Sequence, residues 1–418
     1  MSEIEIVHPL PVEEARPWAR TMATTFLEET QGDEFERYLD SLRRDWAADR
    51  TWGARAHGRW IATLATNARA ITVPGPQGTS RDVMVDALTA VTVNATHRRR
   101  GLLTRMLSES LREARERNDP FSILIAAEWP IYGRFGYAPA TSSATYTYLC
   151  RRSRVQPTGS GVVRQVDPSD LRDIAPQVFE RARALRSGQV SRPGDWWPRR
   201  LGLDGRQTLQ RGKTPNVYLH ESNHGPDGLL WWASEREFDV TGNLGAITVS
   251  DLVASTDVAY RDLWAYLGGI DAVEEITLAR RPIDEPVRWL LSDGRALRQT
   301  HAGDDVWIRL LDVCASLAGR SYAASGRLVL DVVDDDGTGY AAGRFLLEAD
   351  GGDSACRPTE QSPDLRLTQR RLASIYLGGF SLRQLAIGGG IEELTSGAIQ
   401  RADAMFATEL APWNATNF

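Results

Sequence analysis

The first 150 residues alternate apolar strand-like runs with amphipathic segments, a pattern typical of a mixed α/β unit. Partial alternation of polar and apolar positions predicts strands at 59–73 and 82–93, and a continuous apolar run predicts a buried strand at 121–127. Apolar residues at helical spacing predict helices at 12–26, 33–46 and 102–117. We therefore expect a twisted mixed sheet with flanking helices.

The same order of elements begins again after a short linker. Residues 156–163, QPTGSGVV, have the Pro, Gly and Ser content of a linker, and the following residues to 183 repeat the strand, turn and helix order of the N-terminus. Further on, residues 252–267 can be laid beside 91–106 without a gap, which places Asp262 opposite Gly101. The repetition predicts an internal duplication.

A third pattern begins near residue 296. Apolar runs predict strands at 306–313, 326–333 and 343–349, and helical patterns follow at 367–379 and 391–410. A chain of 418 residues is long enough for two or three domains, each with its own core. We divide the chain into domains at 1–152, 153–295 and 296–418.

Composition narrows the function classes. No apolar stretch reaches the ~20 residues that span a membrane, and the N-terminus lacks the basic start and apolar run of a secretory signal, so we expect a cytoplasmic protein without a membrane partner. Three widely separated cysteines and six histidines without ligand spacing predict no metal. The formal charge, 49 basic against 55 acidic residues, argues against a nucleic-acid partner.

One joint between a predicted strand and a predicted helix carries candidate chemistry. Residues 96–107, THRRRGLLTRML, place Gly101 and several arginines at the helix start. A helix N-terminus is a ready anion site; Gly101 allows close backbone approach, and Arg99 and Arg100 add bidentate donors for phosphate oxygens. The sequence therefore indicates a phosphate or pyrophosphate ligand, with a solvated basic turn and a nucleic-acid contact as alternatives.

This joint resembles the acetyl-CoA pyrophosphate loop of the GNAT N-acetyltransferases, Gln/Arg-x-x-Gly-x-Gly/Ala. Arg98 and Gly101 match the pattern, and Leu103 departs from the small residue at its last position. Read together, VTVNATHRRRGLL and IYGRFGYAPAT resemble the enhanced intracellular survival (Eis) acetyltransferases over essentially the whole chain. The resemblance implies tandem GNAT-like domains, the second without the cofactor motif, a sterol-carrier-like α+β domain at the end, and a homo-hexamer.

The same resemblance assigns the acetyl-CoA contacts. Val91 and Val93 would bind the pantetheine arm through main-chain groups, although both could equally be ordinary core residues. Ala127 and Glu128 would line the cofactor where two parallel strands splay apart. The pyrophosphate would be held by Arg99, Arg100, Gly101, Leu102, Leu103 and Thr104.

Two catalytic groups are also implied by the resemblance. Tyr132, the first tyrosine of IYGRFGY, would be the general acid for the departing thiolate. Tyr137 in that role, or a structural role for both tyrosines, is the alternative. The C-terminal carboxylate of Phe418 would be the general base, unless the tail only covers an apolar patch.

The substrate side is less specific. Residues 26–40, FLEETQGDEFERYLD, are rich in carboxylates that could rim a pocket for a cationic amine, or could form the solvated face of a helix. Glu28 best matches an acidic pocket residue of the family, whereas Asn417 stands where a glutamate would help to bind cations.

The function expected from these features is acetyl-CoA-dependent N-acetylation by direct transfer. The acceptors would be primary amines of polyamine-like, aminoglycoside-like or lysine substrates. One alternative is a non-catalytic carrier whose C-terminal domain holds an apolar ligand. A DNA-associated regulator is a third class, which would require binding that depends steeply on salt.

Overall fold

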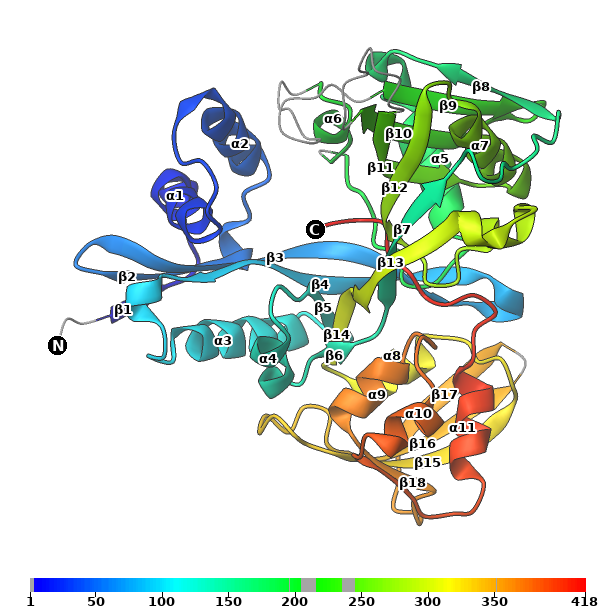
Figure 1. Ribbon diagram of the computed structural model, residues 1–418. Coiled ribbons are helices and arrows are strands. Elements are labelled where there is room, and N and C mark those ends of the chain that lie inside the picture. Colours follow the sequence, from blue (N-terminus) through cyan, green and yellow to red (C-terminus); the bar gives the residue numbers. More distant parts are fainter. Residues whose placement is uncertain (1–3, 195, 204–215, 235–244, 351) are drawn as a thin grey trace.

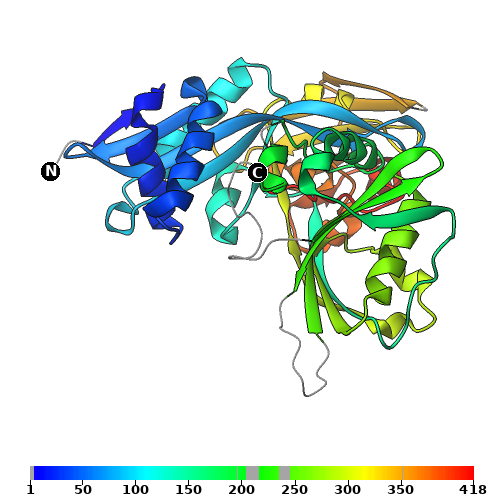
Figure 2. The same ribbon diagram turned by 90° about the horizontal axis from the view of Figure 1, so that it is seen from above.

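The computed structural model describes residues 4–194, 196–203, 216–234, 245–350 and 352–418. Within these ranges the strands form two sheets of seven strands and one of five, each covered by helices (Figures 1 and 2). The mixed sheets with flanking helices confirm the fold class expected from the sequence. Among the residues described, none of the helices combines the length and the apolar character that a membrane-spanning helix needs.

The first sheet carries helices on both faces. Its strands, in spatial order, are β1 (Ile4–Val7), β2 (Thr51–Ala56), β3 (Arg59–Pro74), β4 (Ser80–Val93), β5 (Phe121–Ile125), β14 (Val306–Leu310) and β6 (Ala138–Pro139). On one face lie α1 (Ala15–Thr25) and α2 (Gly32–Arg44), and on the other α3 (Leu102–Glu116) and α4 (Trp129–Tyr132) (Figure 1). Successive side chains of a strand point to opposite faces of the sheet, which explains why both faces carry helices. Trp60 packs with α1 and α2, whereas the neighbouring Ile61 packs with α3.

The second sheet repeats this plan. Its spatial order is β13 (Leu297–Asp304), β7 (Ser142–Leu149), β12 (Val273–Arg281), β11 (Gly245–Ala254), β10 (Gly225–Ser234), β9 (Asn216–Ser222) and β8 (Gly161–Gln165). One hydrophobic core joins side chains of α7 (Asp257–Gly269) with those of β11 and β12. A separate core joins α5 (Ile174–Arg183) and α6 (Trp196–Arg200) with β9 and β10. The two cores place the helices on opposite faces of the sheet.

The helices that cover the third sheet pack against the first domain. Its strands are β17 (Asp353–Pro358), β16 (Gly343–Asp350), β15 (Gly326–Val333), β18 (Leu365–Thr368) and β19 (Ile391–Glu393), with α8 (Val313–Ala318), α9 (Gln369–Ile375), α10 (Leu382–Ile387) and α11 (Ala398–Phe406). Tyr376, directly after α9, lies edge-on against Phe121 of β5, with 5.0 Å between the ring centroids. One continuous core therefore joins the third sheet to the first.

The helix predicted at 391–410 is shorter in the structure. Residues 391–393 form β19, which pairs with β18, and the helix begins only after Gly397, which has φ 81°. The left-handed backbone at Gly397 interrupts the helical path and explains the difference.

Three strands, β7, β13 and β14, cross the expected domain boundaries at 152 and 295; β13 follows the second boundary yet lies at the edge of the second sheet. β7 precedes the first boundary yet lies in the second sheet, between β13 and β12. β14 follows the second boundary yet lies in the first sheet, where it pairs antiparallel with β5 and β6. The sheets are therefore not divided along these boundaries, because antiparallel pairing of β7 with β13 and of β14 with β5 joins strands far apart in the chain.

The structure corrects the gapless alignment of the two halves. β4 ends at Val93 and α3 begins at Leu102, whereas β11 ends at Ala254 and α7 begins at Asp257 after the N-cap Thr256. Asp262, aligned with Gly101, therefore lies inside α7 and accepts hydrogen bonds from Thr158. The structural counterpart of Gly101 is Thr256, and the second domain lacks most of the arginine-bearing loop.

Candidate active site

An opening between β4 and β5 forms the centre of the candidate site. The two strands pair in parallel only at Asp86 with Ser122 and Ala87 with Ile123, and they diverge beyond. Ala90 has φ 53° and lies at a bulge, because Thr92 pairs with Thr63 whereas Thr89 pairs with Ala65. The extra residue twists the end of β4 away from β5.

The end of β4 presents main-chain groups to this opening. The Asn94 N–H donates to the Ile61 carbonyl at 2.8 Å, so this N–H points toward β3. By strand alternation, the main-chain groups of Val93 and Val91 point the other way, into the opening. Their side chains pack against the core beneath α3. The two residues therefore fit both interpretations, with side chains in the core and main-chain groups facing the opening, where the Val93 carbonyl has only a long contact of 3.4 Å with Arg98 Nε.

The arginine-bearing loop ends in a left-handed residue at the start of α3. Gly101 is the N-cap, with φ 74° and ψ 8°, and a Cβ there would meet no atom within 4 Å. The first-turn residues Leu102, Leu103 and Thr104 contribute the unpaired N–H groups of a helix start. The exposed Arg99, with φ 62°, belongs to the same turn.

The arginines of the loop leave donors available. Arg98 Nε lies 3.4 Å from the Val93 carbonyl, and Arg100 Nη2 lies 3.4 Å from the Thr96 carbonyl. Within the described part of the chain, Arg98, Arg99 and Arg100 form no ion pair with a carboxylate. Exposed guanidinium groups beside an uncapped helix start fit a pyrophosphate.

The segment after β5 forms the far edge of the opening. Ala127 and Glu128 are exposed and follow β5 directly beyond the point where β4 and β5 diverge. Glu128 is the N-cap residue of α4, the helix that ends at Tyr132. The structure therefore brings the predicted cofactor-contacting residues to the two sides of one opening.

The two tyrosines of IYGRFGY differ in what their hydroxyls contact. Tyr137 is fully buried, and its hydroxyl lies 2.7 Å from Ser122 Oγ, which in turn contacts the buried Asp86. Tyr132 packs edge-on against Tyr137, with 6.2 Å between the ring centroids, and its hydroxyl has no hydrogen-bond partner among the described residues. The Tyr137 hydroxyl is therefore already bonded within the core, whereas the Tyr132 hydroxyl is available for chemistry.

Burial and the nearby Glu128 carboxylate raise the pKa of Tyr132 to about 12. If the protonated phenol is the active form, turnover should not fall through ionisation of Tyr132 below about pH 11, whereas a tyrosine with the ordinary pKa of about 10 would already be half ionised at pH 10. Turnover measured from about pH 7 to 10.5 tests this. Glu128→Gln removes one cause of the raised pKa, so any loss of turnover at alkaline pH should move to lower pH in this variant. A fall in wild-type turnover centred near pH 10 would contradict the assignment of Tyr132 as the acid.

The C-terminal tail is held along the segment 186–192. Trp413 N donates to Ser187 O at 3.0 Å, and Thr416 Oγ1 donates to Val190 O at 2.8 Å. Val190 in turn bridges to Ile71 of β3. Asn414 and Thr416 are 0% and 1% exposed. The tail is therefore fixed to the first sheet to within two residues of Phe418, whose ring packs against the core shared with the third domain.

Arg192 is a tail-holding residue that the sequence did not reveal. Its guanidinium donates to Thr416 Oγ1 and to the Ala415 carbonyl, both at 3.2 Å, and to Asp251 at 2.7 Å. The same group lies 4.2 Å from the ring centroid of Trp196. Its partners come from distant parts of the chain, so no local pattern marks Arg192.

The candidate acid and base lie on opposite faces of the first sheet. In Figure 1, α3 and α4 lie below this sheet, whereas the C-terminus lies above it, and Figure 2 places the C-terminus between α1–α2 and the second domain. Tyr132 belongs to the core beneath α3, and Phe418 packs against a different core. The opening between β4 and β5 is where a ligand could reach both groups.

Glu28 lies on the same side as the tail. It belongs to the connection between α1 and α2, where its N–H donates to the Ala23 carbonyl at 2.9 Å. Its side chain is exposed, as are Phe26 and Leu27, which is 94% exposed. The structure thus places an acidic and apolar loop above the sheet without a direct contact between Glu28 and the tail.

Comparison with known proteins defines the class of the chain. Two acetyltransferase (GNAT) domain profiles match residues 7–140 and 188–310, and a sterol carrier protein domain profile matches 313–415. The protein is therefore a GNAT N-acetyltransferase, an enzyme whose co-substrate is an acyl-coenzyme A. Among the described residues, no group of three or more His, Cys, Asp or Glu side chains could hold a metal ion.

The relatives define the family. An uncharacterized N-acetyltransferase of Streptomyces griseus is 37% identical over 415 residues, covering 97% of this chain and 98% of the relative. The N-acetyltransferase Eis of Mycobacterium tuberculosis is 32% identical over 340 residues, covering 79% and 80%. The crystal structure of Eis1 from Mycobacterium abscessus, 30% identical, superposes with a TM-score of 0.83 over 100% of both chains. The chain belongs to the Eis family of GNAT N-acetyltransferases, which confirms the resemblance read from its motifs.

Proposed function

We propose that this enzyme transfers the acetyl group of acetyl-CoA directly to a primary amine, without an acyl-enzyme. The observation that carries the proposal is the opening between β4 and β5. Beside it lie an uncapped helix start at Gly101 and, in the core beneath α3, a tyrosine with an available hydroxyl, Tyr132. No metal takes part in this proposal.

The residues of the opening would bind and orient the co-substrate. The helix start at Gly101, with Arg99 and Arg100, would hold the pyrophosphate. The main-chain groups of Val91 and Val93 would pair with the pantetheine arm as a neighbouring strand would. This arrangement directs the thioester toward the tail side of the sheet, where an amine can attack.

The proton of the amine must leave for attack to occur. Deprotonation of a primary amine with a pKa of about 10.4 costs about 4.6 kcal/mol of free energy at pH 7. The carboxylate of Phe418 would accept this proton directly or through water. A free α-carboxylate has a pKa of about 3.5, so the role requires partial desolvation. The ring of Phe418 is half-buried against the core, which supports such a position.

The acceptor would be a cationic amine of the polyamine, aminoglycoside or lysine type. The connection between α1 and α2, which carries Glu28 and Glu29, lies on the side of the sheet on which the tail ends (Figure 1), which favours a cationic substrate there. Asn417 offers no charge next to the base, so the acceptor selectivity would differ from that of relatives with a carboxylate there. The family resemblance further supports a cytoplasmic homo-hexamer, built from three domains near 1–152, 153–295 and 296–418.

The carrier alternative would need a free apolar surface in the third domain. Leu328, Leu330, Leu347 and Leu365 of its sheet are at most 1% exposed and belong to one core with the first sheet. The apolar side of this domain is therefore already covered by protein, which favours the catalytic interpretation.

Substitution of Gly101 by aspartate tests co-substrate binding. The added carboxylate would repel a pyrophosphate at the helix start, so stabilisation of the fold by acetyl-CoA, about 3–5 °C at a hundred times the dissociation constant, should disappear. Thermal unfolding with and without acetyl-CoA measures this.

Gly159→Asp is the matched control. Gly159 has the same φ, 74°, and equally open surroundings, but it lies in the linker. The control should carry the same backbone strain and keep the acetyl-CoA response. Equal stabilisation of the Gly101→Asp protein and wild type would overturn the proposed pyrophosphate site.

A further inference from the structure

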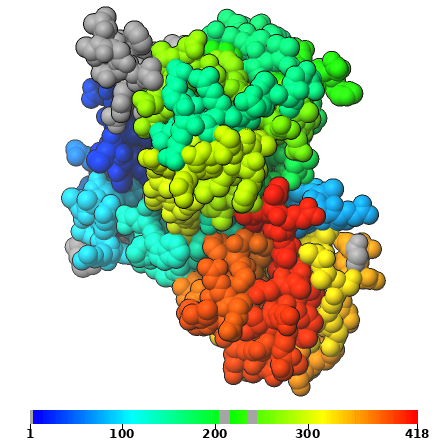
Figure 3. Space-filling model, turned by 45° about the vertical axis from the view of Figure 1, so that its right-hand side comes forward, coloured from blue at the N-terminus to red at the C-terminus, as the bar shows by residue number. Residues whose placement is uncertain are grey.

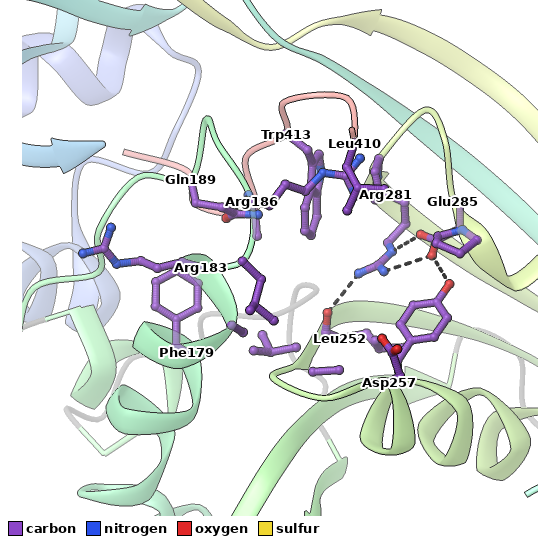
Figure 4. Close-up of a pocket in the computed structure, with 18 of the residues that line it drawn as sticks. Phe179, Arg183, Arg186, Gln189, Leu252, Asp257, Arg281, Glu285, Leu410 and Trp413 are labelled. Carbon is purple, nitrogen blue, oxygen red and sulfur yellow. Dashed lines mark hydrogen bonds and ion pairs between the residues drawn. The ribbon is translucent and has the colours of Figure 1, made fainter. Parts of the chain in front are cut away.

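A cavity of about 210 Å³ lies in the second domain, behind the C-terminal tail (Figure 4). Its walls come from α5, the ends of β11 and β12, the start of α7 and the tail itself. They include Phe179, Leu252, Val253, Tyr260, Arg281 and Trp413. The lining is mostly apolar, with charged groups at particular points.

This cavity occupies the place that corresponds to the acyl-CoA opening of the first domain. β11 and β12 pair in parallel only from Gly245 to Val249 and from Val273 to Leu278, and then diverge as β4 and β5 do. Counted back from the ends of β11 and β4, Leu252 corresponds to Val91. The duplication therefore left a second opening at an equivalent position.

The second opening is closed to coenzyme A by its own side chains. Arg281 Nη1 donates to the Leu252 carbonyl at 2.9 Å, so the main-chain group that a pantetheine arm would use is already bonded. The strand and helix are joined only by Ser255 and Thr256, and α7 begins with Asp257. A carboxylate at the helix start repels a phosphate. Any ligand of this cavity must therefore differ from coenzyme A in its chemistry.

The charges around the cavity favour a cation. Each lining arginine is paired with at least one carboxylate, Arg183 with Asp82 and Glu180, Arg186 with Asp284, and Arg281 with Glu285. Glu285 also accepts a hydrogen bond from Tyr260. Asp257, an exposed residue at the edge of the lining, is the one lining carboxylate for which the described residues offer no hydrogen-bond or ion-pair partner. Figure 4 shows it at the start of α7, beside the other lining side chains.

We propose that this cavity binds a small apolar amine whose ammonium group pairs with Asp257. An apolar cavity of about 150 Å³ holds a benzene ring, so a volume near 210 Å³ fits one ring with a short amine-bearing chain. The ring would lie against Leu252, Val253 and Phe179, and the paired arginines would contribute no free charge.

The ligand would also support the tail. Trp413 and Leu410 form part of the cavity wall, and Trp413 Nε1 donates to the Arg280 carbonyl at 2.8 Å. The tail runs over the surface between the second and third domains (Figure 3). A ligand packed behind Trp413 adds contacts that are lost when the tail leaves its groove, so binding should slow release of the C-terminus.

The test uses N,N-dimethylphenethylamine, an aromatic amine that cannot be acetylated. Calorimetric titration of the full chain should give a dissociation constant on the order of 0.1–1 mM. The neutral analogue 3-phenyl-1-propanol and the Asp257→Asn variant with the amine should each bind about five-fold more weakly. Asp271→Asn, an exposed carboxylate beyond the other end of α7, is the matched control and should bind as wild type does.

Carboxypeptidase digestion provides a second measurement. The amine should slow removal of the C-terminal residues of wild type, and much less that of the Asp257→Asn protein at the same concentration. Two results would overturn the proposal directly: no binding of the amine at concentrations up to about ten times the expected dissociation constant, or equal binding of the amine and the alcohol. A third result would also overturn it: if Glu28→Gln instead of Asp257→Asn weakened binding, the amine would bind at the proposed acceptor site near Glu28. Binding here needs no acetyl transfer, so this proposal and the proposed function fail separately.

Discussion

Replacing Tyr132 with phenylalanine is expected to lower the turnover number for amine acetylation by about a hundred-fold or more, with little change in acetyl-CoA binding. The phenol is the one hydroxyl of the IYGRFGY segment that is not already bonded within the described residues. Release of free thiol from acetyl-CoA at saturating amine measures the rate, and thermal shift by acetyl-CoA measures the binding.

The raised pKa of Tyr132 limits how far this residue can transfer its proton to the departing thiolate. Full proton transfer from a phenol with a pKa of about 12 to a thiolate whose conjugate acid has a pKa of about 8.5 is uphill by about 5 kcal/mol. Tyr132 would therefore stabilise the developing sulfur charge by a hydrogen bond while the bond to carbon breaks, and the proton would move late. The loss in Tyr132→Phe should consequently appear in turnover and not in the amine concentration at half-maximal rate.

Tyr137→Phe is the matched control for this variant. It removes a hydroxyl of the same chemistry from the neighbouring ring, but that hydroxyl is bonded to the buried Ser122. The expected result is a loss of about 1 kcal/mol in the free energy of unfolding with nearly unchanged turnover of the folded enzyme. If the two variants lose turnover equally, or if Tyr132→Phe is fully active, the assignment of the acid is wrong.

Adding one glycine after Phe418 is expected to lower the acetylation rate by about a hundred-fold. The tail is fixed by buried contacts as far as Thr416, so the extra residue moves the terminal carboxylate by about 3.5 Å relative to the sheet. Proton transfer requires hydrogen-bond distance, which the displaced carboxylate would no longer have. The measurement is again thiol release, with thermal unfolding to verify that the fold is retained.

Thr416→Val separates the position of the carboxylate from the mere presence of the tail. This nearly isosteric change removes the hydrogen bonds of Thr416 Oγ1 with Val190 and Arg192 and leaves the chain length unchanged. A smaller loss of rate is expected than for the extension, because the carboxylate keeps its mean position but becomes less ordered. If the extended protein acetylates as fast as wild type, the tail only covers an apolar patch and another group must be the base.

The local elements were predictable because short-range patterns define them. The helix at 102–117 and the strands at 59–73 and 82–93 agree with α3, β3 and β4 to within two residues at each end. The helix at 391–410 failed in its first half, since the backbone of Gly397 and pairing of 391–393 with β18 outweighed the apparent helical pattern.

The candidate site was predictable only in part. Gly101 and its arginines are contiguous, so the motif pointed to an anion site, with a solvated basic turn as an alternative until the family resemblance favoured the pyrophosphate. The choice between Tyr132 and Tyr137 stayed open from the residues alone, because it depends on Ser122, which lies on another element. Arg192 gave no signal, since its partners Thr416 and Asp251 are distant in the chain.

By itself, the sequence determined most of the order of helices and strands, the duplication of the first unit and a helix start that carries Gly101 and three arginines, because periodicity, turn residues and contiguous motifs act over a few residues. The tertiary structure alone decided that β7, β13 and β14 join sheets outside their expected domains, that the gapless alignment of Asp262 with Gly101 fails, and that the tail ends above the first sheet. These features depend on hydrogen bonds and packing between residues separated by a hundred or more positions, and no local pattern encodes such pairings.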